Sequence, residues 1–119
     1  MSSGLAGTIK RIAVVGSRTF NDVTSLEREL SKFRPEIIVS GGSKGADQLA
    51  EKYAAKHGLL VEIYEPDWRL GRGAGLIRNT EIVKNADLII AFWDGKSRGT
   101  LDSIKKAEKM EKPVVIVRF

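Results

Sequence analysis

The turn Ser40-Gly41-Gly42-Ser43-Lys44-Gly45 joins an apolar run to an amphipathic one, which is typical of a strand followed by a helix. Residues 36–39 are predicted to form a short strand, and residues 46–57 a helix with one buried face. The glycines let the backbone approach a phosphate closely. At the start of a helix, unpaired amide groups and the helix dipole favour an anion. We therefore expect this turn to bind phosphate.

The alternation of strand and helix continues in both directions from this turn. Strands are predicted over residues 11–15, 36–39, 60–64, 88–92 and 113–117, and helices over about 23–33, 46–57, 76–85 and 101–110. Thr24 and Glu27 have capping-box spacing, and Gly58 is expected to be a left-handed helix C-cap. The pattern predicts an α/β fold. We expect a Rossmann-like three-layer sandwich, with a five-stranded parallel sheet of order 3-2-1-4-5 and helices on both faces.

Composition sets the broad class of the protein. The chain has 119 residues, which suits one domain; we expect residues 11–119 to form it and residues 1–10 to be a flexible tail. No cysteine and one histidine are present, so we expect no disulfide and no metal site. Apolar runs are far shorter than the ~20 residues of a membrane span. We expect a cytoplasmic protein with no membrane partner, and the net charge of +5 favours anionic partners.

The predicted topology places the ligand. In an open parallel sheet, ligands bind beyond the C-terminal strand ends, where the strand order reverses. This point lies between the strands over residues 11–15 and 88–92. The loops there are Gly16-Ser17-Arg18-Thr19, the turn from Ser40 to Asp47, and residues 93–100. All three are rich in Gly, Ser, Thr and basic residues, so a shared binding crevice is expected.

Each candidate site residue has a chemical reason. Thr100 can cap a helix and present its hydroxyl to a phosphate. Trp68 or Trp93 could stack on a base, although a tryptophan that packs a loop onto the core is commoner. The expected ligand contacts are Gly16, Ser17, Arg18, Ser40, Gly41, Gly42, Ser43, Lys44, Gly45, Asp47, Trp68, Arg78, Asn79, Trp93, Ser97, Arg98, Gly99 and Thr100.

Two better-known nucleotide motifs are absent. Ser40–Gly45 lacks the spacing of a Walker A loop, so no ATPase or GTPase is predicted. Gly71-Arg72-Gly73-Ala74-Gly75 follows a loop and not a strand end, so it is no dinucleotide fingerprint. It is either a flexible lead-in to the next helix, or a second phosphate cradle or lid.

Several of these segments together resemble the SLOG superfamily, and in particular its small stand-alone members. The similar segments are Gly16-Ser17-Arg18, residues 40–47, Pro66-Asp67-Trp68, Arg78-Asn79 and residues 91–100. The resemblance covers nearly everything after Lys10. It implies a Rossmann-like fold that binds nucleotides or nucleotide-derived ligands.

One branch of that superfamily, LOG, comprises nucleoside-monophosphate phosphoribohydrolases. The resemblance puts Arg78 at the arginine of these enzymes and residues 94–103 on their glycine-rich motif. Ser103 stands where they have a glutamate, and Asp102 would point about 100° away on a helix. Cleavage of an N-glycosidic bond needs a carboxylate. Arg78 and Asp94 are the catalytic candidates for this alternative, and the missing glutamate weakens it.

The other branch, the DNA-processing protein A family, implies single-stranded DNA binding, which ranks third because a second module is not evident. The preferred hypothesis is a domain that binds or senses a nucleotide or an ADP-ribose-like ligand. No cofactor is required in this hypothesis, with the nucleotide itself as ligand. LOG-type relatives imply a homodimer.

Overall fold

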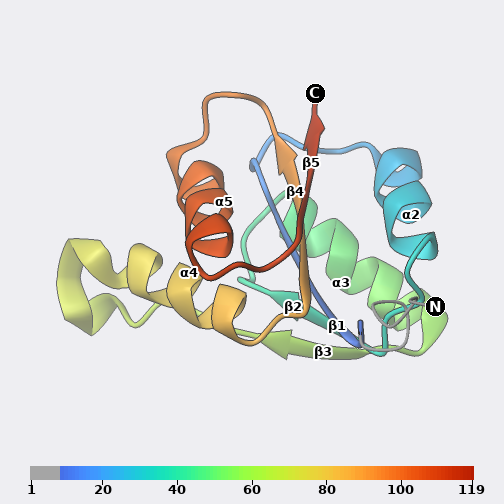
Figure 1. Cartoon of the computed structure of the whole chain (residues 1–119), viewed down its shortest axis with the longest axis horizontal. Helices are drawn as coiled ribbons and strands as arrows, with labels where there is room; N and C mark the ends of the chain where they lie inside the picture. The colour runs from blue at the N-terminus through green and yellow to red at the C-terminus, as the bar shows by residue number, and fades with distance from the viewer. Residues whose placement is uncertain (1–8) are drawn as a thin grey trace.

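The computed structural model describes residues 9–119, which form a parallel sheet with helices on both sides (Figure 1). The order in this part of the chain is β3-β2-β1-β4-β5, which confirms the predicted Rossmann-like topology. The strands are β1 (Arg11–Gly16), β2 (Ile37–Ser40), β3 (Leu60–Ile63), β4 (Leu88–Trp93) and β5 (Val114–Arg118). The helices are α2 (Val23–Ser31), α3 (Ala46–His57), the 3-10 segment η1 (Trp68–Gly73), α4 (Ala74–Lys84) and α5 (Arg98–Lys109).

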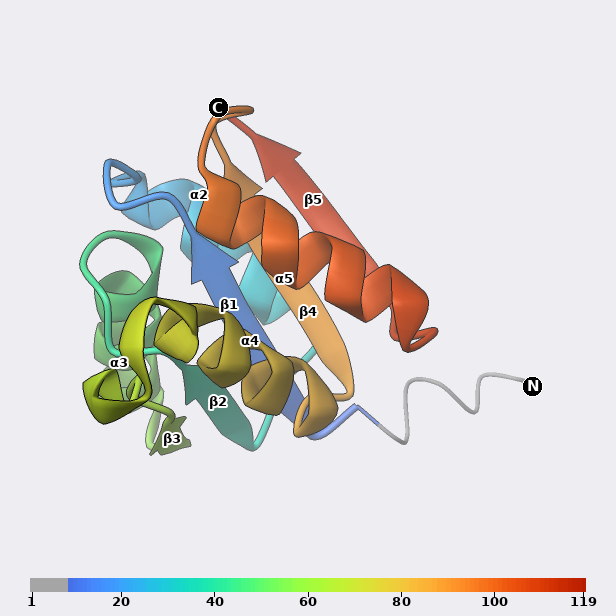
Figure 2. The ribbon, with the colours of Figure 1, turned by 90° about the vertical axis from the view of Figure 1, so that its left-hand side faces the viewer.

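Side chains of β1 alternate between two hydrophobic cores. Ile12 and Val14 pack with residues of α2 and α3 on one face of the sheet. Ala13 and Val15 pack with residues of α4 and α5 on the other face, where Figure 2 shows these two helices side by side over the strands. β4 is buried from Leu88 to Phe92 and pairs with both β1 and β5. A continuous apolar strand needs cover on both faces, so its predicted inner position is confirmed.

Two helices are capped by residues other than those expected. Asp22 accepts a hydrogen bond from a first-turn amide at 3.0 Å, so it caps α2 in place of Thr24. Ser97 accepts a hydrogen bond from the amide of Thr100 at 3.3 Å, so α5 begins earlier than predicted and Thr100 lies in its first turn. Asp, Ser and Thr are all favourable N-caps, so the local sequence does not determine which of several neighbouring candidates caps the helix. Gly58 is the left-handed C-cap of α3, as predicted.

The start of the domain lies slightly before the predicted boundary. Residues 1–8 of the expected tail lie outside the described residues. Ile9 packs against the core on the α2 and α3 face. The amide of Lys10 donates to a side-chain oxygen of Asp87 at 3.0 Å. These two residues therefore belong to the folded domain and not to a tail.

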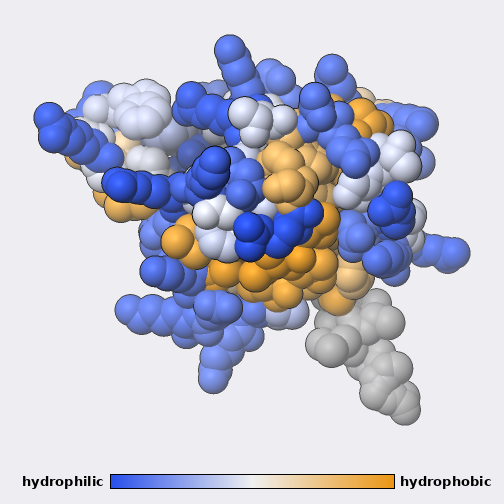
Figure 3. All heavy atoms as spheres, turned by 90° about the horizontal axis from the view of Figure 1, so that it is seen from above, coloured by the Kyte–Doolittle hydropathy of each residue, from blue (hydrophilic) through white to orange (hydrophobic). Residues whose placement is uncertain are grey.

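The surface is mixed in character. Figure 3 shows the molecule from above, with a hydrophobic area surrounded by hydrophilic residues. The edge strands leave apolar side chains exposed, among them Leu60 and Ile63 on β3 and Ile116 on β5. Within residues 9–119, no helix has the combined length and hydrophobicity of a membrane span.

The start of α3 packs closely against the loop that follows β1. Gly45 immediately precedes α3 and has a φ of 79°. A Cβ atom built there would lie 2.5 Å from the carbonyl oxygen of Ser17 and 2.7 Å from that of Arg18. Only glycine fits both the backbone conformation and this approach. The contact fixes the first turn of α3 beside the C-terminal end of β1.

This contact predicts a large effect of Gly45→Ala. The positive φ costs about 1–2 kcal/mol and the collision with two carbonyl groups adds to it, so we expect a loss of about 3 kcal/mol in the free energy of unfolding. Gly58→Ala is the control, because Gly58 also has a positive φ, with a left-handed helical ψ of 27° in place of −127° at Gly45, and meets no atom within 4 Å. It should cost about 1 kcal/mol. Urea denaturation measures both, and equal losses would contradict the close-packing argument.

Candidate functional site

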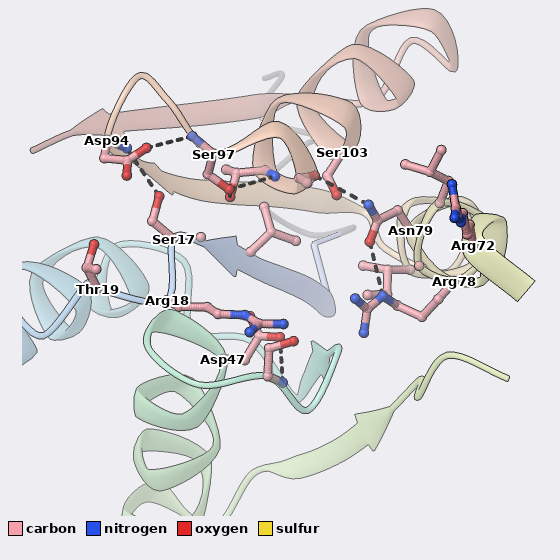
Figure 4. Close-up of a pocket in the computed structure, with 18 of the residues that line it drawn as sticks. Ser17, Arg18, Thr19, Asp47, Arg72, Arg78, Asn79, Asp94, Ser97 and Ser103 are labelled. Atoms are coloured by element: carbon pink, nitrogen blue, oxygen red, sulfur yellow. Dashed lines mark hydrogen bonds between the residues drawn. The ribbon is translucent and has the colours of Figure 1, made fainter. Parts of the chain in front are cut away.

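A cleft of about 550 Å³ lies at the C-terminal ends of β1 and β4, between these strand ends and α4 (Figure 4). This volume is in the usual range for small-molecule sites. Its lining residues are Val15, Gly16, Ser17, Arg18, Thr19, Ser43, Asp47, Trp68, Arg72, Gly75, Leu76, Arg78, Asn79, Ile82, Asp94, Ser97, Gly99, Thr100 and Ser103.

Most of the predicted site residues line this cleft. The structure brings together Gly16, Ser17, Arg18, Ser43, Asp47, Trp68, Arg78, Asn79, Asp94, Ser97, Gly99 and Thr100. It leaves the following predicted residues out of the lining: Ser40, Gly41, Gly42, Lys44, Gly45, Trp93 and Arg98. Lys44 and Gly45 line an adjoining groove instead.

The carboxylate of Asp47 occupies the amide groups of the glycine-rich turn. Its Oδ2 accepts hydrogen bonds from the amides of Gly41 at 3.2 Å and Ser43 at 3.1 Å. The amide of Gly42 donates to the hydroxyl of Ser40 at 3.1 Å. Three of the amides that were expected to hold a phosphate, those of Gly41, Gly42 and Ser43, are therefore already bonded within the chain. A ligand phosphate has to find other donors in the cleft.

Burial shifts the protonation of Asp47. Its side chain is 6% exposed. Burial raises the pKa of Asp47 from 3.8 to about 6, against the amide hydrogen bond from Ser43 and the positive charge of Arg78, which act to lower it. A carboxyl group in a cleft with a pKa close to neutral has an electrostatic influence that changes with pH.

Arg78 joins the glycine-rich turn to α4. Its Nη1 donates to the carbonyl oxygen of Gly41 at 2.8 Å, and its Nε donates to Oδ1 of Asn79 at 3.0 Å. Burial lowers the pKa of Arg78, while the negative charge of Asp47 raises it. Arg78 thus holds the cleft together and also presents positive charge to it. Figure 4 shows the guanidinium of Arg18 pointing toward Arg78 across the cleft.

A second hydrogen-bond network forms the β4 side of the cleft. Asp94 Oδ1 accepts hydrogen bonds from the amides of Lys96 and Ser97, both at 2.8 Å. These bonds hold the pKa of Asp94 below its usual value. The amide of Asp94 donates to the hydroxyl of Ser17 at 3.3 Å, which ties the β4 loop to the β1 loop. Asp94 shapes this loop, and its low pKa makes it a poor proton donor near neutral pH.

The two tryptophans have different surroundings. The Nε1 of Trp93 donates to the carbonyl oxygen of Ser97 at 3.1 Å, and the Arg118 guanidinium lies 5.1 Å from its ring centroid. These contacts pack the β4 loop, and Trp93 is absent from the cleft lining. Trp68 starts η1, lines the cleft and is 68% exposed. Of the two, Trp68 is the one available to a ligand.

Ser103 lies in the wall of the cleft and is buried. Asp102 points elsewhere, as the helical spacing predicts: its Oδ2 accepts from Nδ2 of Asn79 at 3.1 Å and from Nζ of Lys106 at 2.8 Å. The carboxylates in the cleft lining are therefore Asp47 and Asp94. In the described part of the chain, no cluster of three potential metal-ligating His, Asp or Glu side chains is found.

Some lining residues were not predicted. Thr19 directly follows the predicted Gly16-Ser17-Arg18 and lay within the quoted loop. Arg72 lies in the segment Gly71–Gly75, for which the sequence left two interpretations open; it is the basic side chain of that segment and could have been singled out. Leu76 and Ile82 are apolar α4 residues that carry no chemical pattern, so sequence alone does not distinguish them from core residues.

The fold and site together define a Rossmann-like α/β domain with a polar, arginine-lined cleft at the switch point of its sheet. The model of the YspA, cpYpsA-related SLOG family (YAcAr) matches residues 10–71, and the chain belongs to this family. A curated relative is the Gene 61 protein of Mycobacterium phage D29, which is 33% identical over 119 residues. The match covers 90% of this chain and 95% of that protein.

Solved structures of DNA processing protein A have a similar fold. The Streptococcus pneumoniae protein aligns with a TM-score of 0.73 and 22% identity over 94% of this chain and 51% of its own, so this chain spans about half of its length. The Helicobacter pylori protein aligns with a TM-score of 0.64 and 25% identity over 97% of this chain and 68% of its own. The latter structure is described by its single-stranded DNA binding mode.

The raised pKa of Asp47 predicts a specific pH dependence of stability. Between about pH 4 and pH 6 the folded protein keeps a proton that the unfolded chain has released, so ionising Asp47 lowers stability as pH rises. Asp47→Asn keeps an acceptor oxygen and removes the titration. Relative to this variant, the wild type should lose about 2 kcal/mol of unfolding free energy between pH 4.5 and pH 7. Urea denaturation at several pH values measures the difference, and a difference that is constant or of opposite slope would refute the assignment.

Proposed function

We propose that the cleft binds a nucleotide or a nucleotide-derived ligand. The observation that carries this proposal is the gathering of Arg18, Arg72 and Arg78 in a cleft that also contains the exposed ring of Trp68. Guanidinium groups pair with phosphate oxygens bidentately, and an indole ring can stack on a base. The size of the cleft suits one such ligand.

Arg18 is the main phosphate contact in this proposal. Its side chain is exposed, and it has no hydrogen bond or ion pair with another described residue. Opposite it, the first turn of α5 brings Gly99 and Thr100 to the cleft wall. A helix N-terminus adds favourable electrostatics for an anion. A phosphate between Arg18 and this turn would not need the amides that Asp47 already occupies.

Hydrolysis of the ligand is not part of the proposal. Ser103 supplies no carboxylate at the position where the LOG enzymes have one. Asp102 is hydrogen-bonded to Asn79 and ion-paired with Lys106, and it is absent from the cleft lining. Asp94 accepts two loop amides. Asp47 is bonded to the glycine-rich turn. Both carboxylates of the cleft lining are therefore engaged within the chain, and we assign neither to the stabilisation of an oxocarbenium-like transition state.

A single strand of DNA is the second candidate ligand. The Helicobacter pylori relative is described by its single-stranded DNA binding mode. Proteins of this kind combine positive grooves with aromatic side chains on which bases stack. Arg18, Arg72 and Trp68 provide such groups here. The same cleft would then hold one nucleotide of a longer ligand.

Removal of Arg18 should weaken binding. A panel of AMP, ADP, ATP, ADP-ribose and an oligodeoxythymidine is titrated by calorimetry into the folded protein. We expect Arg18→Ala to reduce the affinity for the best ligand by about fivefold, because an exposed cation that pairs with phosphate is lost. Arg28→Ala is the charge-matched control, since Arg28 is exposed on α2 and is absent from the cleft lining. If no panel member binds, the proposal is wrong.

The tryptophans give an independent test. Trp68→Phe should abolish the change in tryptophan fluorescence on ligand binding, because Trp68 is the exposed indole in the cleft lining. Trp93→Phe should retain the change. The opposite result would assign the base contact to Trp93 and contradict the role proposed for Trp68.

A further inference from the structure

A second groove adjoins the cleft. It has a volume of about 370 Å³ and is lined by Arg18, Thr19, Phe20, Asn21, Lys44, Gly45, Gln48, Leu49 and Lys52. Arg18 and Thr19 line both hollows. On the glycine-rich turn, Ser43 lines the cleft, and Lys44 and Gly45 line the groove. Consecutive residues of two loops thus lead from one hollow into the other, so the two are neighbouring parts of one surface track.

The groove is positively charged. Its charged lining residues are Arg18, Lys44 and Lys52, and no Asp or Glu is among the residues that line it. All three cations are exposed. Among the described residues, neither lysine forms an ion pair.

Three acidic residues of α2 and α3 have other partners within the chain. Glu51, next to Lys52 in sequence, accepts from the hydroxyl of Ser40 at 2.7 Å. Glu27 pairs with Lys56 at 3.3 Å, one helical turn beyond Lys52. The carboxylate of Asp47 is held by the glycine-rich turn. The positive charge of the groove is therefore left for a partner outside the chain.

We propose that this groove is a second phosphate subsite, which receives the sugar-phosphate backbone of a single-stranded polynucleotide as the strand leaves the cleft. The proposal rests on the function proposed for the cleft and names the ligand class more closely. Arg18, shared by the two hollows, contacts the phosphate between the first nucleotide and the next. Lys44 and Lys52 contact the phosphate that follows. A mononucleotide fills the cleft and leaves both lysines unused.

The distribution of chemical groups favours a nucleic acid over other anions. Trp68 gives a stacking surface at the cleft, and the groove gives cations, while its aromatic residue, Phe20, is only 3% exposed. A positive groove that follows the backbone, together with an aromatic ring on which a base stacks, is typical of single-strand binding that tolerates different sequences. An acidic peptide would satisfy the cations but would have no base for Trp68.

The test uses the full chain and ligands of increasing length. Affinities are measured for thymidine monophosphate, oligodeoxythymidines of two, four and eight nucleotides, an eight-nucleotide oligouridine and an octaglutamate peptide. We expect affinity to rise at least tenfold from the mononucleotide to the tetranucleotide. DNA and RNA share the phosphate backbone, so comparing the deoxy and ribo strands shows which of the two is preferred. Binding of either strand supports the proposal.

The decisive variant is Lys44→Ala with Lys52→Ala. It should lose about tenfold in affinity for the tetranucleotide and less than twofold for the mononucleotide. The slope of log affinity against log salt should become shallower by about 0.7, because the contacts to one phosphate are removed. The matched control is Lys105→Ala with Lys109→Ala, which removes equal charge from exposed positions on α5 and should change neither value.

The outcomes separate this inference from the function proposed for the cleft. The groove proposal would be refuted if mononucleotide binding depended on Arg18 but longer strands bound no more tightly and the lysine variant had no effect. The proposal for the cleft would then still stand. Equal losses in the lysine variant and its control would also overturn the groove proposal, as would equally tight, lysine-dependent binding of octaglutamate. Absence of binding by every ligand would overturn both proposals. Circular dichroism and urea denaturation confirm that each variant is folded.

Discussion

The buried carboxylate of Asp47 organises this end of the molecule. Burying a charge is costly unless hydrogen bonds and an opposite charge compensate it. Here the amides of Gly41 and Ser43 and the nearby guanidinium of Arg78 compensate it in part, and the remaining cost of burial raises the pKa of Asp47. Asp47 belongs to the first turn of α3, the amides follow β2, and Arg78 lies on α4. One buried group therefore fixes the geometry between three elements and, with it, one wall of the cleft.

This arrangement moves the expected recognition from the backbone to the side chains. Amides in a glycine-rich turn can bind a phosphate at a fixed position, but Asp47 already occupies two of them. The cations that remain are on flexible side chains such as Arg18, Arg72 and Lys44. Contacts of this kind depend on the charge of the ligand more than on its shape, and their contribution to affinity decreases with salt. Because Asp47 occupies these amides, the turn has a structural role. The separate exposed cations that remain favour a ligand with several phosphates.

The sequence was sufficient for the fold and for the position of the cleft, because both follow from the alternation of apolar strands and amphipathic helices. It was not sufficient for the partners of individual groups. A glycine-rich turn before a helix looks the same whether its amides meet a ligand or a carboxylate such as Asp47. Trp68 and Trp93 likewise both lie near the C-terminal ends of predicted strands, and the contacts of Trp93 with Ser97 and Arg118 distinguish the two. These contacts are tertiary, so no local pattern encodes them.

The openness of the site also bears on affinity. An exposed cation gains little from one phosphate, because water screens the pair and the side chain loses entropy on binding, so a single contact contributes about 1 kcal/mol or less. Arg18, Lys44 and Lys52 are all exposed. Affinity can then grow by linking several weak contacts through one ligand, since each further contact is made without another loss of translational freedom. A strand that crosses from the cleft into the groove uses the surface in this way, whereas a small nucleotide uses only part of it.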